Sequence, residues 1–294
     1  MIEKKSLQAV GMILVGVLAL SAMDAAVKWL LIRDMSPFQI IAVRGWIITL
    51  FLLLSLLRQG SYALRTTRLR AHLVRTVIGF LAPVAFFISL KTVPLANATA
   101  IFFSATFFLA AGSALVLRER VGYHRWIAIV GGFAGVLVVT APTSDVFQPA
   151  SLLALVAGAS YAVLVLTGRW LSTTETTFRL VFYYNAITTL LATVALPLVW
   201  RTPTLEEMGM ILLVSILALI GYVFLTRAFT LGPVGLVAPF EYSALLWAVL
   251  FGFVFWGEMP ESRVWLGLSI IISSGIYIVY RERQHSRQAA TGSR

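Results

Sequence analysis

The 294-residue sequence has no cysteine and only three histidines, and charged residues make up just 12% of it. Without cysteine, disulfide bonds, thiol catalysis and cysteine-based metal sites are excluded. His72, His124 and His285 have no spacing typical of metal ligands, so neither a metal nor any other cofactor is expected. Soluble globular chains contain about 25% charged residues. The low charge content therefore excludes an ordinary soluble domain.

Apolar residues make up 60% of the chain and fall in runs of about 20 residues, the length that a helix needs to cross a bilayer. A backbone inside a bilayer must satisfy its own hydrogen bonds, so each run is predicted to be a helix. The sequence thus predicts an all-α integral membrane protein with ten transmembrane helices and no soluble catalytic domain. The expected spans are 7–32, 37–57, 72–91, 95–117, 124–140, 150–171, 178–199, 207–229, 235–256 and 262–280.

The net charge of +11 is explained by the positive-inside rule rather than by binding to nucleic acid. If the amino terminus lies inside, the alternation of ten spans places most Lys and Arg residues at inner ends and loops. The sequence therefore predicts that both termini are cytoplasmic, that the lipid bilayer surrounds the chain, and that no nucleic acid is bound. The tail at 282–294 is predicted to be disordered.

An internal repeat emerges when the chain is shifted by 139 residues. Each half, 1–142 and 143–281, then holds five spans, and because five is odd the second copy enters the membrane from the opposite side. Inverted repeats of this kind are typical of secondary transporters, in which the substrate binds near the midplane between the halves. The shift matches Pro94 with Pro233, Ser104 with Ser243, Ala105 with Ala244, Glu119 with Glu258, and Trp126 with Trp265.

With this pattern the chain resembles the ten-helix EamA-type family of the drug/metabolite transporter superfamily. Each repeat of that family has a turn proline, an apolar helix, a Gly-Glu pair and a glycine-rich last helix. The second half keeps Gly257-Glu258, and its stretch APFEYSALLW is similar to the YddG-like amino-acid exporter branch. The first half has Pro94, Arg118-Glu119 with arginine in place of the usual glycine, and Gly131-Gly132-x-x-Gly135. The resemblance implies a multi-pass protein of the bacterial inner membrane.

Three charges lie inside the first two spans, and charges inside a bilayer suggest function by default. Asp24 and Lys28 are one helical turn apart, and Arg44 enters the second span from the same side. One interpretation is a structural ion pair, Asp24–Arg44 or Asp24–Lys28, that holds the two spans together. The other is that these charges face the carboxylate or amino group of a substrate.

Glu241 is a second isolated acid, and the repeat places the apolar Phe102 at the equivalent position. Three roles remain open for it. Glu241 pairs locally, with Arg227 as a candidate partner, or contacts a substrate amine or acts in gating, or carries a proton during transport.

Polar and aromatic side chains well inside the spans are further candidates for a binding cavity, although most aromatic residues in such a chain are expected to serve packing. We expect these residues to bind substrate or to act in gating: Phe102, Ser104, Tyr161, Tyr184, Asn185 and Tyr242. Pro83 and Pro239 lie inside spans and are hinge candidates, with static bends as the alternative. Glycines of the fifth and tenth spans favour close helix contact, within a monomer as the favoured interpretation or in a homodimer.

The sequence thus predicts a secondary transporter, not an enzyme, that exports amino acids, including aromatic ones, and related small metabolites by alternating access. The alternative is an importer or exchanger of a nucleotide-like or sulfonium metabolite on the same fold. A membrane enzyme would need clustered acids or a nucleophile with its base, but Asp24 and Glu241 are expected near opposite faces of the bilayer. A channel would need a continuous polar helix face, which the sequence does not show.

Overall fold

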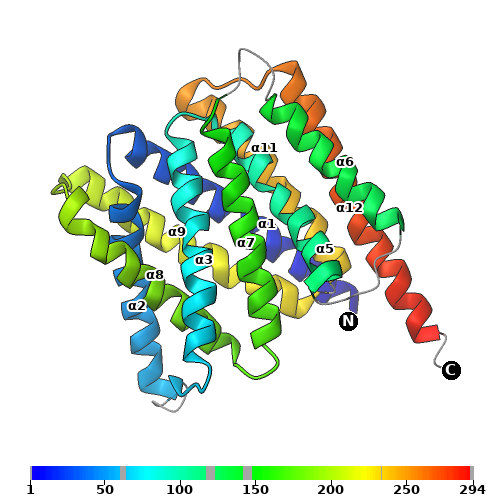
Figure 1. Cartoon of the computed structure of the whole chain (residues 1–294), viewed down its shortest axis with the longest axis horizontal. Helices are drawn as coiled ribbons and strands as arrows, with labels where there is room; N and C mark the ends of the chain where they lie inside the picture. The colour runs from blue at the N-terminus through cyan, green and yellow to red at the C-terminus, as the bar shows by residue number, and fades with distance from the viewer. Residues whose placement is uncertain (1, 60–63, 117–122, 142–147, 233, 292–294) are drawn as a thin grey trace.

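The computed structural model describes residues 2–59, 64–116, 123–141, 148–232 and 234–291, and these residues form helices joined by short turns (Figure 1). The helices are α1 (Ile2–Ile32), α2 (Pro37–Gln59), α3 (Leu69–Leu90), α4 (Leu95–Phe102), α5 (Ser104–Val116), α6 (Tyr123–Thr140), α7 (Ser151–Leu171), α8 (Thr177–Val199), α9 (Leu205–Leu231), α10 (Val234–Val237), the 3₁₀ helix η2 (Ala238–Tyr242), α11 (Ser243–Trp256) and α12 (Ser262–Thr291).

Eight segments of the described chain are long and apolar enough to cross a membrane. Two shorter apolar helices, Trp126–Thr140 and Ser262–Ile278, complete a set of ten, which confirms the predicted all-α membrane fold. Helix α12 continues to Thr291, so residues 282–291 are helical where the sequence predicted a disordered tail. Arg118, Glu119 and Pro233 of the predicted motifs lie outside the described residues.

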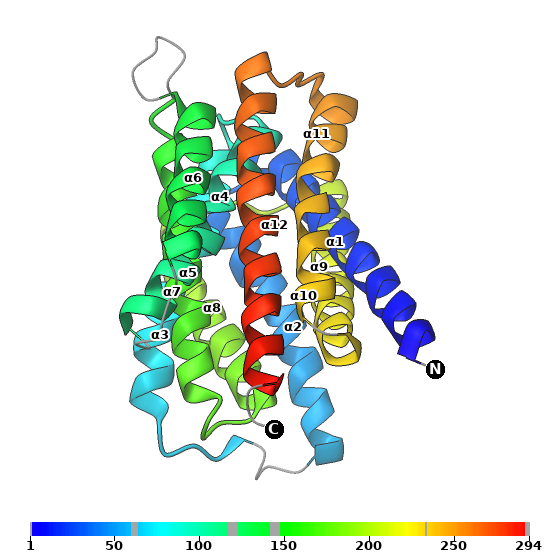
Figure 2. The ribbon, with the colours of Figure 1, turned by 90° about the vertical axis from the view of Figure 1, so that its right-hand side faces the viewer.

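The helices pack mainly in pairs that join the two halves of the chain: α1 with α9, α2 with α8, α3 with α7, and α6 with α12. Figure 1 shows α6 and α12 side by side along one edge of the bundle. The halves therefore interlock instead of forming two separate bundles. In Figure 2 both chain termini lie at the lower end, which we call the terminus end, and the other is the opposite end.

Two of the ten spans are interrupted, at equivalent places in the repeat. Helix α4 ends at Phe102 and α5 begins at Ser104. In the second half, η2 separates α10 from α11, which begins at Ser243, the repeat equivalent of Ser104. Discontinuous helices mark the substrate sites of many transporters, because they free backbone groups near the midplane. Here the sequence predicted continuous spans at 95–117 and 235–256.

The two hinge candidates occupy different settings. Pro239 lies at the start of η2, where a proline is tolerated because the first N–H groups of a helix need no partner within it. Pro83 lies inside α3, which runs without interruption from Leu69 to Leu90. That either proline moves during transport stays a prediction.

Helices α6 and α12 approach each other closely through small residues. A Cβ atom added at Gly267 would lie 2.8 Å from the carbonyl oxygen of Gly135 and 2.5 Å from Cγ2 of Val139. A Cβ atom at Gly131 would lie 3.2 Å from Oγ of Ser274. These small residues therefore pack against one another within the chain.

We predict that Gly267→Ala destabilises the protein by about 2 kcal/mol, because the added methyl group forces the backbones of α6 and α12 apart. Gly209→Ala is the matched control, since a Cβ atom at Gly209 would have no neighbour within 4 Å. Thermal unfolding of both variants in detergent measures the difference. Equal melting temperatures for the two would contradict this packing.

Candidate functional site

A buried ion pair closes the opposite end of the bundle. Lys28, near the end of α1, pairs with Glu258, and the Lys28 side chain is only 4% exposed. Lys28 Nζ also donates a hydrogen bond to the carbonyl oxygen of Val93 (3.3 Å), and the N–H of Leu95 donates to Glu258 Oε2 (2.9 Å). The ring of Trp256 lies 5.0 Å from Nζ. This group, which we call the Lys28–Glu258 clamp, joins α1, the α3–α4 turn and the end of α11.

The clamp depends on how α11 ends. Gly257 has φ +66°, a left-handed conformation that favours glycine, and it turns the chain so that the N–H of Glu258 bonds to the carbonyl oxygen of Gly252 (3.1 Å). The Glu258 carboxylate is thereby brought over the ends of α1 and α4. The Gly-Glu pair of the sequence motif thus has a local structural reason in the second half.

The predicted Asp24–Lys28 ion pair is wrong, because Lys28 extends toward the end of the bundle and finds Glu258 there. The Asp24–Arg44 ion pair is not formed either. Among the described residues, Asp24 has no hydrogen bond or ion pair, and Arg44 acts on it only electrostatically. Nη1 of Arg44 lies 3.5 Å from Sδ of Met23, and its guanidinium lies 5.8 Å from the ring centre of Phe87. Both charges are half-buried.

A second network closes the opposite end beside the clamp. The buried Gln39 of α2 donates from Nε2 to the carbonyl oxygen of Arg201 (2.6 Å) and accepts from its N–H (3.2 Å). The Arg201 guanidinium donates to the carbonyl oxygen of Arg33 (3.1 Å) and forms an ion pair with Glu207 (2.6 Å). Glu207 in turn completes a capping box with Thr204 at the start of α9. The ends of α1, α2 and α9 are thus tied together.

A further set of polar side chains belongs to helices that do not pack extensively on one another. Tyr161 of α7 lies within electrostatic range of Glu241 of η2, Tyr222 of α9 and Tyr184 of α8. Yet in the described chain α7 and α8 make no extensive contact with α9, α10 or η2. Tyr161 and Tyr222 are 41% and 51% exposed. In the described chain, α7 and α8 are therefore largely separated from α9, α10 and η2.

Together with Asp24 and Arg44, these four residues form what we call the central cluster. Tyr184 connects its parts, because it interacts electrostatically with both Tyr222 and Arg44. Glu241 has neither a hydrogen bond nor an ion pair among the described residues, so the predicted pairing with Arg227 is not formed. Electrostatic range thus links Asp24 to Arg44, Arg44 to Tyr184, and Tyr184 through Tyr161 to Glu241. That these residues bind a solute stays a prediction.

An aromatic row borders the central cluster at the break between α4 and α5. Phe102 lies between Phe86 of α3 (ring centres 5.1 Å apart) and Tyr161 (5.5 Å). Offset or tilted rings at such distances attract each other and provide an apolar face for a flat ligand. That Phe102 contacts a substrate or acts in gating stays a prediction.

Three predicted residues lie elsewhere. Tyr242 is buried, stacks on Phe103 with ring centres 5.0 Å apart, and its hydroxyl fits against Gly275 of α12, where a Cβ atom would collide with it. Ser104 is buried against Gly158 of α7. Asn185 donates within its own helix to the carbonyl oxygen of Val181 (3.0 Å). Ser104 and Asn185 are therefore not grouped with the central cluster, whereas Tyr242 lies within electrostatic range of Glu241 but is packed away from it against α12.

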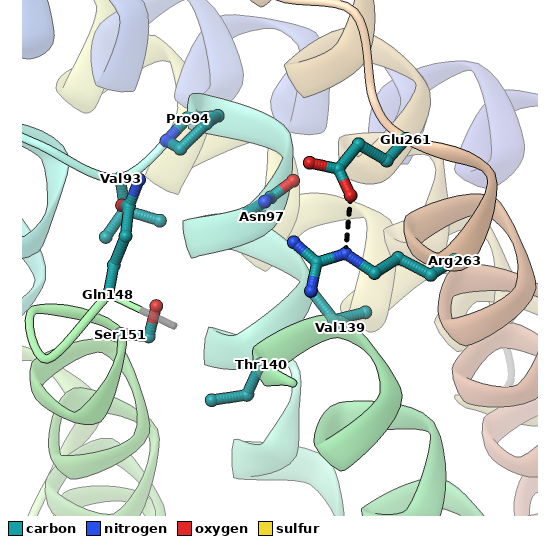
Figure 3. Close-up of a pocket in the computed structure, with 9 residues that line it drawn as sticks. All are labelled: Val93, Pro94, Asn97, Val139, Thr140, Gln148, Ser151, Glu261 and Arg263. Carbon is teal, nitrogen blue, oxygen red and sulfur yellow. Dashed lines mark ion pairs between the residues drawn. The ribbon is translucent and has the colours of Figure 1, made fainter. Parts of the chain in front are cut away.

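A separate small pocket lies at the opposite end (Figure 3). Figure 3 shows the Glu261 carboxylate directed at Arg263 (Oε2 to Nε 2.7 Å), with Asn97 of α4 beside the pair. The cavity volume is about 70 Å³, enough for about two water molecules at about 30 Å³ each. Metabolite pockets are usually about 300 Å³ or more, so this pocket is not the transport site.

Sequence reasoning missed the role of Glu258 and left Tyr222 out of the candidate set. The signal for Glu258 was present, because it matches Glu119 in the repeat and belongs to the same membrane end as Lys28. The available signal for Tyr222 is its position on α9, because it lies on a different side of the helix from the exposed apolar residues. Those residues are Leu212, Leu213, Ile216, Ile220 and Val223.

Comparisons with known proteins agree with this architecture. The model of a family described as the EamA-like transporter family matches residues 7–141 and again residues 148–281. A riboflavin transporter from Rhizobium johnstonii is 33% identical over 96% of this chain and 94% of its own. A pseudopaline exporter from Pseudomonas aeruginosa is 34% identical (82% and 83% covered), and an S-adenosylmethionine uptake transporter from Rickettsia bellii is 25% identical (94% and 94%).

Among solved structures, one crystal structure of a protein has a TM-score of 0.64 at 18% identity and covers 94% of this chain and 98% of its own. This likeness concerns the fold alone. The same helical arrangement therefore exists in an experimentally determined protein of little sequence similarity.

We predict that Glu258→Gln opens the opposite end, because it leaves the buried Lys28 ammonium without its carboxylate. The chain has no cysteine, so a single cysteine at position 24 reports access directly. A membrane-impermeant maleimide added at the opposite end should label Asp24→Cys about tenfold faster with Glu258→Gln, the factor for about 1.4 kcal/mol. Glu261→Gln on the same turn is the control. Unchanged labelling in the Glu258 variant would contradict a closing role.

Proposed function

Since the chain belongs to the EamA-like transporter family, we propose that it is a secondary transporter that exports amino acids, aromatic ones included, and related small zwitterionic metabolites. The central cluster carries this proposal. It offers unpaired carboxylates to an ammonium group, one guanidinium to a carboxylate, and the row of Phe86, Phe102 and Tyr161 to an aromatic side chain. These are the three parts of an aromatic amino acid.

The route of the substrate follows from which end is closed. The Lys28–Glu258 clamp and the Gln39–Arg201 network hold the opposite end together, whereas α7 and α8 make no extensive contact with α9, α10 or η2. We infer that the substrate enters the central cluster from the terminus end in this state. Release requires the clamp to break and the terminus end to close.

Orientation and location complete the proposal. The excess of Lys and Arg at inner ends supports a cytoplasmic terminus end, so entry from that end corresponds to export. The bacterial relatives support the inner membrane as the location. Since the small residues of α6 and α12 are covered within the chain, we propose that a monomer is the working unit.

The second candidate is an importer or exchanger of a nucleotide-like or sulfonium metabolite. The name of the Rickettsia bellii relative, an S-adenosylmethionine uptake transporter, favours it, as does the name riboflavin transporter for the Rhizobium johnstonii relative. The same aromatic row would accept a planar base or ring. The name of the Pseudomonas aeruginosa relative, an exporter, favours the first candidate.

We predict that liposomes containing the purified protein and loaded with radiolabelled tryptophan, phenylalanine or leucine release the amino acid faster than protein-free liposomes with the same load. Riboflavin and S-adenosylmethionine are assayed in the same way, in both directions. Asp24→Asn should slow amino-acid efflux because it removes a carboxylate that accepts the ammonium group. Efflux of the metabolites without efflux of any amino acid would favour the second candidate instead.

We predict that Glu241→Gln abolishes any dependence of efflux on a pH gradient, because the half-buried Glu241 carboxylate has no hydrogen-bond or ion-pair partner among the described residues and is therefore available to take up and release a proton. Glu206→Gln, at the exposed start of α9, should keep that dependence. Efflux is measured with and without an imposed gradient for both variants. A Glu241→Gln protein that still responds to the gradient would remove the proton-carrier role.

A further inference from the structure

A polar cluster that is distinct from the central cluster lies near the terminus end of α3. His72, Arg75 and Thr76 are spaced i, i+3 and i+4, so they share one face of the helix. Their exposed fractions are 0%, 8% and 0%. Helix α3 packs mainly on α7 and also on α8, and His72 lies against the ring of Tyr183 of α8 (ring centres 4.6 Å apart).

Five polar atoms of this cluster have no hydrogen-bond partner among the described residues. They are both ring nitrogens of His72, Nε and Nη1 of Arg75, and Oγ1 of Thr76. Buried polar groups are almost always hydrogen-bonded, and a buried charge without a partner is more costly still. Whichever nitrogen of His72 carries the proton, the cluster keeps several unpaired donors on one helix face.

The nearest described acid on the neighbouring elements already has partners. Glu175 accepts from the hydroxyl of Thr66 (2.5 Å) through Oε1 and pairs with Arg179 (3.3 Å) through Oε2. The hydroxyl of Tyr183 donates to the carbonyl oxygen of Leu64 (2.8 Å). The guanidinium of Arg75 is therefore left without a carboxylate among the described residues.

The surrounding helices are shaped around the Arg75 guanidinium and connect it to the central cluster. A Cβ atom at Gly168 of α7 would lie 3.1 Å from Nη2 of Arg75, so a glycine there leaves the space that the side chain uses. Tyr184 interacts electrostatically with both Arg44 and Arg75. Arg75 therefore lies, like Arg44, within electrostatic range of Tyr184 of the central cluster.

We propose that His72, Arg75 and Thr76 form a binding site for a carboxylate, which they hold while a solute passes between the terminus end and the central cluster. One guanidinium matches the single charge of a carboxylate, and the Thr76 hydroxyl and a His72 N–H supply further donors. This assignment rests on the proposed function only in one respect, namely that the carboxylate belongs to the transported solute. A free inorganic anion is the alternative ligand with the same kind of charge.

Thermal unfolding of the full chain in a neutral detergent tests the site without any transport. Sodium acetate replaces sodium chloride at constant ionic strength, and the fluorescence of the tryptophans is followed. At ten times the Kd, acetate should raise the melting temperature by about 3 °C. Arg70→Gln, an exposed residue on the same helix, should keep this rise, and Arg75→Gln should lose it. Equal stabilisation of the Arg75 variant, or no effect of acetate on the unchanged protein, would overturn the proposal.

If Arg75→Gln does not fold, Arg75→Lys replaces it, because lysine keeps the charge but not the guanidinium. The acetate midpoint should then rise about fivefold, and an unchanged midpoint would overturn the site. Sodium phosphate, tryptophan and tryptophanamide distinguish the sources. Stabilisation by tryptophan but not by tryptophanamide would show that the site binds the carboxylate of the solute. Stabilisation by phosphate alone would overturn the carboxylate assignment. A response to acetate with no amino-acid efflux would leave this site intact while the proposed function fails.

Discussion

A charge inside a bilayer is costly unless it is paired or serves a function, and the Lys28–Glu258 clamp shows how this constraint determines the packing at one end of the protein. Lys28 is almost fully buried, and the clamp supplies it with a carboxylate, a backbone carbonyl and an aromatic ring. At the opposite end of the bundle, the helix ends are held together by paired charges. In contrast, Asp24 and Glu241 are half-buried and have no hydrogen-bond or ion-pair partner among the described residues. The pairing of charges thus distinguishes the closed end of the bundle from the region that we propose to hold a polar solute.

The interlocked halves bear on the proposed opening of this closed end. Each main packing pair joins one helix of the first half to one of the second, so no half can move without changing contacts to the other. The two interrupted spans meet at the centre of this arrangement, where Phe103 and Tyr242 stack. Interruptions weaken the helices at the places where movement has to be absorbed. Close contacts between small residues hold α6 and α12 together at the edge of the bundle.

Much of the fold could be predicted from the sequence, because hydrophobic runs of membrane length and an odd number of spans per repeat are strong constraints. Isolated acids such as Asp24 and Glu241 were also visible, since a charge in an apolar run stands out. The partner of Lys28 could not be predicted in the same way, because Glu258 lies 230 residues further along the chain. The break at Phe103 has no proline or glycine to signal it. The direction of the Tyr242 side chain depends on the space left by Gly275, which only the packed helices reveal.

The stacking of Phe103 on Tyr242 has a consequence for the proposed alternating-access cycle. The two residues are equivalent in the repeat, so exchanging the conformations of the two halves converts this contact into itself. In the proposed cycle it is therefore a contact present in both end states, and it favours neither of them. The Lys28–Glu258 clamp has no such symmetry, because the exchange transfers its role to another pair. Substitutions at Phe103 or Tyr242 would thus change how firmly the protein holds together, whereas substitutions at the clamp would change how its time is divided between facing inward and facing outward.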